Sequence, residues 1–164
     1  MTKNLDKDGL SSVVNNYDLF YIDLWGVIHN GIKLNELAIK VLKELKKINK
    51  NFVLLTNAPR PNEVVKNFLK NLGMSEELRN HVFTSGEAAL SYLSKFYQSK
   101  NFFHIGPPRD FDLFNTFKNN KSADLKESEY LLCTGLFVEH DKDLNYYKNF
   151  LEKHVSKKLV CTNP

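Results

Sequence analysis

The chain has little arginine, and its positive charge is not gathered in one place. Only Arg60, Arg79 and Arg109 are arginines, and the lysines that carry most of the charge are scattered among acidic residues. A protein that binds nucleic acid usually presents a basic face or stripe. Although the formal net charge is +4, we therefore expect no nucleic-acid partner.

Cysteine is also scarce, and long apolar runs are absent. The two cysteines, Cys133 and Cys161, lie in apolar, strand-like runs without CxxC spacing, which favours buried thiols over a redox pair or a metal site. No apolar stretch approaches the roughly 18 residues of a membrane span, and the opening MTKNLDKDGL lacks a signal-peptide pattern. We expect a soluble, cytoplasmic protein with no membrane partner.

What the chain has is an alternation of apolar runs and segments with helical spacing. With 42% hydrophobic residues it can bury a core. Strands are predicted at residues 19–24, 52–56 and 82–84, and helices at 36–50, 61–72 and 85–96. This βαβαβα order predicts an α/β fold with a Rossmann-like parallel sheet, whose ligands lie at the carboxyl ends of the strands.

A second segment begins near residue 101. Strands are predicted at 101–106, 129–135 and 158–162, with helices around 110–117 and 143–153. The acidic EHDKD run at residues 139–143 contains enough metal-ligand types for a cation, but acids ahead of a helix usually cap it.

Polar residues end each of the first three strands. These are Asp23, then Thr56 and Asn57, then Thr84, Ser85 and Gly86. Any one of them is explained by a turn or a helix cap, which is the simplest role for Ser85. A carboxylate after an apolar run is costly without a partner, so Asp23 is a structural acceptor, a metal ligand or a covalent nucleophile.

The ordered series YIDLWGVI, LLTNAPRP and VFTSGEAALSYL resembles the haloacid-dehalogenase-like hydrolase superfamily. The similarity is to subfamily IIA, which is related to nucleotide and p-nitrophenyl phosphate phosphatases and carries a large C2-type cap. The resemblance implies that residues 1–97 form the N-terminal part of the hydrolase core and residues 98–164 part of the cap. FFHIGPP, LLCTGLF and CTNP are similar to stretches of that cap.

Carried over by position, the resemblance gives roles to four residues. Asp23 is the nucleophile that attacks phosphorus and also a Mg²⁺ ligand, and the main-chain carbonyl of Trp25 is a second ligand. Thr56 binds a phosphoryl oxygen, and Asn57 shapes the turn and offers its backbone amide. The implied function is Mg²⁺-dependent hydrolysis of a small phosphorylated metabolite. Lys33 and Arg60 are further candidates to attract phosphate, although a solvated surface charge is the simpler interpretation of each.

Trp25 departs from the family pattern, because phosphatases of this superfamily place a general-acid Asp there. General acid catalysis is typically worth about 10²- to 10⁴-fold, so its loss puts ordinary phosphomonoester hydrolysis in doubt. Dehalogenases of the superfamily have an aromatic residue at this position. The alternatives are therefore proton-independent displacement, a substitute acid such as His29, or a non-catalytic member that binds a ligand or a protein. A surface role for His29 is the simpler interpretation.

The terminal CTNP resembles a family motif cut before its Asp. The resemblance implies that a lysine and further acids of the site follow in complete members. We therefore expect this chain by itself to be a truncated fragment without useful catalysis. Open sheet edges would favour self-association into a homo-oligomer or marginal stability.

Overall fold

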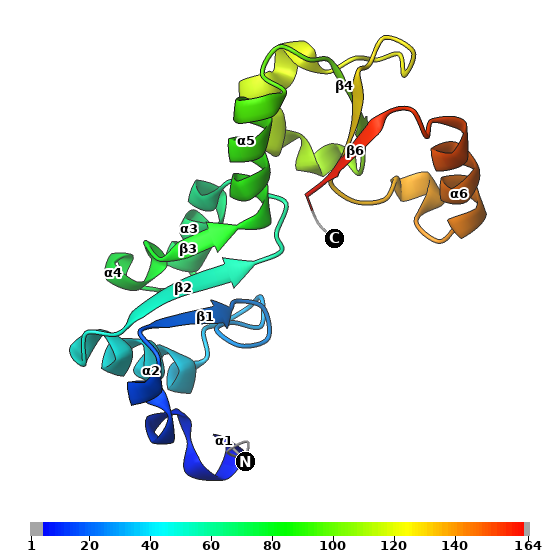
Figure 1. Cartoon of the computed structure of the whole chain (residues 1–164). Coiled ribbons are helices and arrows are strands. Elements are labelled where there is room, and N and C mark those ends of the chain that lie inside the picture. The colour runs from blue at the N-terminus through cyan, green and yellow to red at the C-terminus, as the bar shows by residue number, and fades with distance from the viewer. Residues whose placement is uncertain (1–4, 163–164) are drawn as a thin grey trace. The chain divides into compact units, whose positions relative to one another are not determined.

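The computed structural model describes residues 5–162 (Figure 1). The α-helices are α1 (Leu5–Asp8), α2 (Glu36–Lys47), α3 (Asn62–Asn71), α4 (Glu76–Arg79), α5 (Ser85–Phe96) and α6 (Leu144–Lys153). The strands are β1 (Leu19–Asp23), β2 (Asn51–Thr56), β3 (Val82–Thr84), β4 (Phe102–Ile105), β5 (Tyr130–Cys133) and β6 (Lys158–Cys161). The 3₁₀ helices are η1 (Leu10–Ser12), η2 (Val14–Asn16), η3 (Pro108–Asn120) and η4 (Val138–His140). The predicted α/β class is confirmed.

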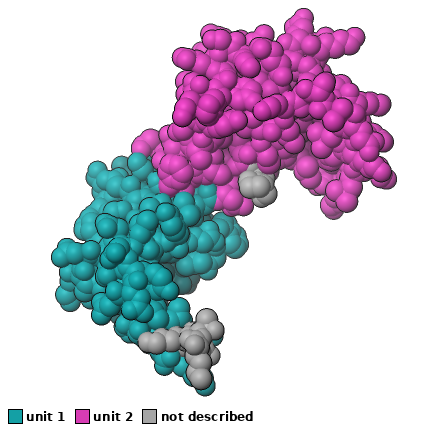
Figure 2. All heavy atoms as spheres, viewed as in Figure 1, with its two compact units in different colours: residues 1–56, 66–82 teal, residues 57–65, 83–164 magenta. Residues whose placement is uncertain are grey.

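The chain divides into two compact units, coloured separately in Figure 2. The first comprises residues 1–56 and 66–82, and the second comprises residues 57–65 and 83–164. The boundary between hydrolase core and cap that the sequence predicts at residue 97 concerns family organisation, and it stays a prediction.

The first sheet has the strand order β1-β2-β3, with β1 and β2 parallel. The register pairs Leu19 with Asn51 at one end of the ladder and Asp23 with Leu55 at the other. The crossover is α2, which starts where the Asn35 side chain accepts hydrogen bonds from the next turn of backbone. Parallel pairing therefore brings the carboxyl ends of β1 and β2 to one edge of the sheet.

The apolar face predicted for α2 is only partly buried. Leu42 and Leu45 are buried, whereas Leu37 is 72% exposed and Val41 and Ile48 are also exposed. Helical spacing fixes which side chains share a face but not how much of that face a neighbour covers.

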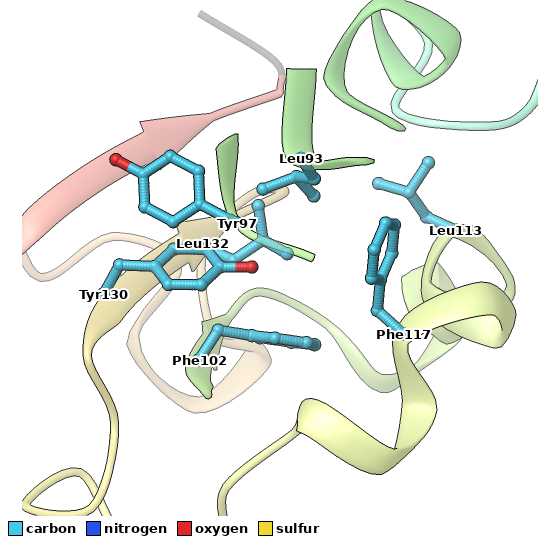
Figure 3. Packing of buried hydrophobic residues seen from close by; sticks show 7 residues of the cluster. All are labelled: Leu93, Tyr97, Phe102, Leu113, Phe117, Tyr130 and Leu132. Atoms are coloured by element: carbon cyan, nitrogen blue, oxygen red, sulfur yellow. The ribbon is translucent and has the colours of Figure 1, made fainter. Parts of the chain in front are cut away.

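The second sheet is parallel throughout, in the order β4-β5-β6. Tyr130 pairs with Phe102 on one side and with Lys158 on the other. Figure 3 shows the core beside this sheet, where aromatic rings from strand and helix face one another. The cluster consists of Leu93, Tyr97, Phe102, Leu113, Phe117, Tyr130 and Leu132.

Within the second unit, the segment 57–65 is fastened to the start of α5. Thr84 caps α5 by accepting from the Glu87 amide at 2.9 Å, and its hydroxyl donates to the Arg60 carbonyl oxygen at 2.5 Å. Ser85 donates to the Ala58 carbonyl oxygen at 3.0 Å. The helix α5 is therefore capped by Thr84 and not by Ser85, which was the expected cap. The hydroxyls of both residues donate to the loop that follows β2.

Candidate functional site

Asp23 is the last residue of β1, and its side chain is exposed. Its Oδ1 accepts a hydrogen bond from the Leu24 amide at 2.8 Å. In the described residues this is the only hydrogen bond assigned to the carboxylate, so Asp23 is oriented but not enclosed by a salt bridge. A solvent-facing carboxylate held at a strand end can reach a ligand without moving backbone.

The residues after Asp23 form a tight loop. The Gly26 amide donates to the His29 carbonyl oxygen at 2.8 Å, and the Ile28 amide donates to that of Leu24 at 2.9 Å. Within this loop the Trp25 ring is 67% exposed. Over residues 5–162 no hydrogen-bond donor is assigned to the Trp25 carbonyl oxygen. That oxygen remains available to a ligand.

His29 is buried, which corrects the expectation of a surface loop histidine. Its Nδ1 accepts from the Gly31 amide at 3.0 Å, and its ring meets Phe68 edge to face at 5.2 Å. Burial lowers the pKa of His29, and the charge of Asp23 opposes that shift only in part. A general acid must hold a proton before it can give one, so the lowered pKa makes His29 a poor replacement for the missing Asp.

Thr56 ends β2, one residue beyond Leu55, which is the register partner of Asp23. Asp23 and Thr56 therefore lie at the same edge of the sheet, on adjacent strands. Asn57 is the next residue in the chain and begins the second unit, where it is exposed. Of the predicted site residues, Asp23, Trp25 and Thr56 belong to one compact unit.

The donor atoms at this edge fit magnesium in kind. Mg²⁺ prefers carboxylate, carbonyl and water oxygens, and Asp23 and the Trp25 carbonyl are of these types. Among the described residues, however, no three His, Cys, Asp or Glu side chains gather into a metal-binding group. Of the two ligands named for this site, Asp23 is the anionic one, and water or phosphate oxygens would have to complete the coordination.

Each of the two predicted phosphate-attracting cations lines a hollow in its own unit. Lys33 lies on a cavity of about 300 Å³ beside the Trp25 loop, with Glu36 and His29 also in its wall. Arg60 lies on a larger cavity of about 470 Å³ in the second unit, with Arg109 and Asp110. Both cavities mix charges of either sign, so neither is a purely cationic phosphate site.

Sequence reasoning missed a buried polar pair in the second unit. His104 Nε2 and Thr134 Oγ1 are 2.8 Å apart and both residues are buried. Burial, aided by Lys121 and opposed by Asp110, lowers the pKa of His104 to about 4. The signal was a histidine inside the apolar FFHI strand, where a buried imidazole needs a partner.

The acidic run at 139–143 acts as a helix cap. Asp143 Oδ1 accepts from the Tyr146 amide at 2.9 Å, at the start of α6. This confirms the simpler of the two predictions for that run.

Residues 20–117 match the family model described as haloacid dehalogenase-like hydrolase. Because the match covers more than half of the sequence, the chain belongs to this family, as its motifs predicted. No curated protein sequence matches the chain at the significance required.

Solved structures share the fold. A haloacid dehalogenase-like hydrolase from Brucella suis is similar over 94% of this chain and 57% of its own, at 27% identity and TM-score 0.76. A 4-nitrophenylphosphatase from Thermotoga maritima gives 24% identity and TM-score 0.64, over 92% of this chain and 56% of its own.

A glycerol phosphate phosphatase from Mycobacterium tuberculosis, solved in complex with magnesium, gives 18% identity and TM-score 0.62, over 92% of this chain and 45% of its own. The chain thus spans about half the length of these proteins. In the described residues no helix has the length and apolar character needed to cross a bilayer.

Proposed function

We propose that this chain supplies the nucleophile and the phosphate-binding edge of a phosphatase that acts on small phosphorylated metabolites. The observation that carries the proposal is the parallel register of β1 and β2, with exposed Asp23 ending one strand and Thr56 ending the other. A carboxylate fixed at a strand end favours in-line approach to phosphorus, and a neighbouring hydroxyl can hold a phosphoryl oxygen without added charge. The phosphatase names of two structural neighbours support the same class of substrate.

In the proposed reaction, a carboxylate oxygen of Asp23 attacks phosphorus and the bond from phosphorus to the leaving oxygen breaks. The acyl phosphate formed on Asp23 is then hydrolysed by water, which releases inorganic phosphate and restores the carboxylate. The Leu24 amide fixes the carboxylate through Oδ1. Thr56 would donate its hydroxyl proton to a phosphoryl oxygen, and the Asn57 amide would supply a second donor.

Mg²⁺, held by the Asp23 carboxylate and the Trp25 carbonyl, would offset the negative charge that carboxylate and phosphate bring together. A cytoplasmic setting and self-association belong to this proposal as well. We also propose that residues 1–97 belong to the hydrolase core and that residues 98–164 form part of the cap.

The test is to trap the intermediate. The chain is incubated with Mg²⁺ and acetyl phosphate, and the acyl phosphate is reduced with borohydride, which converts the modified aspartate to homoserine. Mass spectrometry of the peptide containing residue 23 should find homoserine in the wild type and none in Asp23→Asn. Asp18→Asn is the matched control, because Asp18 immediately precedes the same strand and is fully exposed. Because the chain by itself is expected to lack useful catalysis, the outcome that would contradict the proposal is labelling that persists in Asp23→Asn.

Trp25, an aromatic residue where phosphatases of this superfamily place a general-acid Asp, favours a second candidate, displacement at carbon that needs no proton donor. In that reaction Asp23 would form an ester with the substrate carbon and release halide. A panel of haloacids assayed for halide release, beside phosphate esters assayed for phosphate, separates the two. Halide release that depends on Asp23 would replace the phosphatase proposal. If neither halide nor phosphate is released and an intact ligand still binds, the chain would be a non-catalytic member of the family.

A further inference from the structure

The two cysteines are register partners in the second sheet. Cys133 ends β5 and Cys161 ends β6, and the parallel ladder pairs them directly. Adjacent strands lie about 4.7–4.9 Å apart. A disulfide usually joins Cα atoms about 4.4–6.8 Å apart, so the register places the two Cα atoms at a separation that a disulfide spans.

Both side chains leave the same face of the sheet, because paired residues of parallel strands point the same way. The pair one step earlier, Leu132 and Val160, packs on the core cluster of Figure 3. Successive side chains alternate between faces, so Cys133 and Cys161 both lie on the face away from that cluster. They are the only cysteines in the sequence, and neither is oxidised in this structure.

The two thiols differ in access to solvent. Cys161 is exposed, whereas Cys133 is partly buried and its Sγ donates to the Gly135 carbonyl oxygen at 3.4 Å. Burial raises the pKa of Cys133 to about 11, with a further contribution from Cys161 beside it. Cys133 therefore stays protonated near neutral pH, and a reagent in solution meets Cys161 first.

We propose that Cys133 and Cys161 form a redox-active dithiol that closes reversibly to a disulfide across β5 and β6. The oxidant is a low-molecular-weight disulfide such as glutathione disulfide. The exposure of Cys161 corrects the expectation of two buried thiols. The proposed dithiol is independent of the proposed chemistry at Asp23.

The reaction takes two exchange steps. The Cys161 thiolate attacks one sulfur of the oxidant, whose S–S bond breaks, and one small thiol leaves after taking up a proton. Cys133 gives up its proton and attacks Cys161 Sγ in the mixed disulfide, which releases the second thiol. The two protein thiols lose two electrons and two protons, and the oxidant is reduced to two thiols.

The disulfide would fasten β6 to the middle strand of its sheet. At present β6 continues into Thr162, whose amide and hydroxyl both donate to the Cys133 carbonyl oxygen, at 2.9 Å and 3.2 Å. A covalent link at the preceding pair would close residues 134–160 into a loop and reduce the conformational freedom of the unfolded chain. Oxidation should therefore raise the midpoint temperature of unfolding by several degrees.

The test measures the equilibrium between dithiol and disulfide in glutathione buffers of graded ratio. Free thiols are alkylated after acid quenching and counted by intact mass, first on the folded chain and then in strong denaturant. Folding is checked by far-ultraviolet circular dichroism. We expect two alkyl groups under reducing buffers, none under oxidising buffers, and an equilibrium constant at least tenfold larger in the folded chain than in the unfolded one. A constant that is equal or smaller in the folded chain would overturn the proposal, as would disulfides formed only between chains.

Two serine variants test the order of attack. Cys133→Ser should accumulate a glutathione adduct at Cys161, because no second thiol can displace it. Cys161→Ser should react more slowly with the same oxidant, because its remaining thiol is partly buried and protonated. An adduct on the wild type that never resolves to the internal disulfide would refute the pairing. Faster reaction of Cys161→Ser would refute the assigned order.

Discussion

The Thr84 hydroxyl donates a hydrogen bond to the Arg60 carbonyl oxygen at 2.5 Å, and this contact joins the loop after β2 to the start of α5. The backbone of Arg60 also closes over Gly86. A Cβ built on Gly86 would lie 2.4 Å from both the Arg60 nitrogen and the Arg60 oxygen. The loop that begins at Asn57 therefore depends on a residue without a side chain at position 86.

We predict that Gly86→Ala destabilises the protein by roughly 1–3 kcal/mol, the usual cost of overpacking, despite the better helix propensity of alanine. Urea unfolding followed by circular dichroism measures the change. Gly135→Ala is the control, because a Cβ there meets Pro107 Cδ at an ordinary 3.4 Å. Equal stability of Gly86→Ala and wild type would mean that the Arg60 loop shifts without cost.

A second prediction concerns Thr56. Thr56→Val should weaken binding of inorganic phosphate in the presence of Mg²⁺ by about 1–3 kcal/mol, because a polar partner would be left unpaired. Thr56→Ser keeps the hydroxyl and should bind nearly as well as wild type. Isothermal titration calorimetry on the three proteins decides the matter. Unchanged affinity in Thr56→Val would reduce Thr56 to a strand end.

Trp25 gives a third prediction. In a protein with measurable turnover, Trp25→Asp should raise kcat for alkyl phosphates by about 10²- to 10⁴-fold, since it supplies the absent general acid. Trp25→Asn, which lacks the acid, should not. The gain should be much smaller for p-nitrophenyl phosphate, whose leaving group needs little protonation. A gain of the same size for both substrates would point to a change in packing and not to proton donation.

Histidine at position 104 should make stability depend on pH. The unfolded chain takes up a proton near the ordinary pKa of 6.5, whereas the folded chain resists protonation until about pH 4. Protonation of residue 104 therefore costs the folded state nothing above about pH 6.5. As the pH falls from 6.5 toward 4, it favours the unfolded chain and the free energy of unfolding declines. The free energy of unfolding, measured in urea at intervals across this range, should follow that decline.

In His104→Gln, which keeps a hydrogen-bonding group near Thr134, the part of the slope due to this residue should disappear. The variant and the wild type can differ in free energy of unfolding at pH 7, because the test compares how that free energy changes with pH. If the variant and the wild type lose stability in parallel between pH 6.5 and 4, the titration belongs to other groups.

The sequence predicted the elements well where apolar runs end abruptly. Strand 82–84 was predicted at its observed bounds, and the end of β1 was predicted one residue beyond Asp23. A polar residue after a buried run is a local signal, and the family motif made it a specific one. This is why the strand ends that carry the candidate site could be predicted from residue types and order.

What the sequence could not supply was information about pairing and coverage. The closeness of Cys133 to Cys161 depends on β5 and β6 being neighbours in register, and no local spacing records strand order. Burial of His29 depends on Phe68, which belongs to α3, almost forty residues further along the chain. Exposure of Leu37 likewise depends on what lies over α2. Each of these outcomes is set by contacts distant in the sequence.

Parallel pairing also constrains how the chain reaches its fold. Leu19 pairs with Asn51, and Tyr130 pairs with Lys158. During synthesis, roughly thirty further residues must therefore be added after β1 or β5 begins before its partner strand begins to appear. At a synthesis rate of about 5–20 residues per second, that delay is on the order of 2–6 s. Throughout it the edge of the first strand that faces the missing partner has no strand to pair with. Contacts of such long range close slowly, and the nascent chain should therefore spend seconds as a substrate for chaperones.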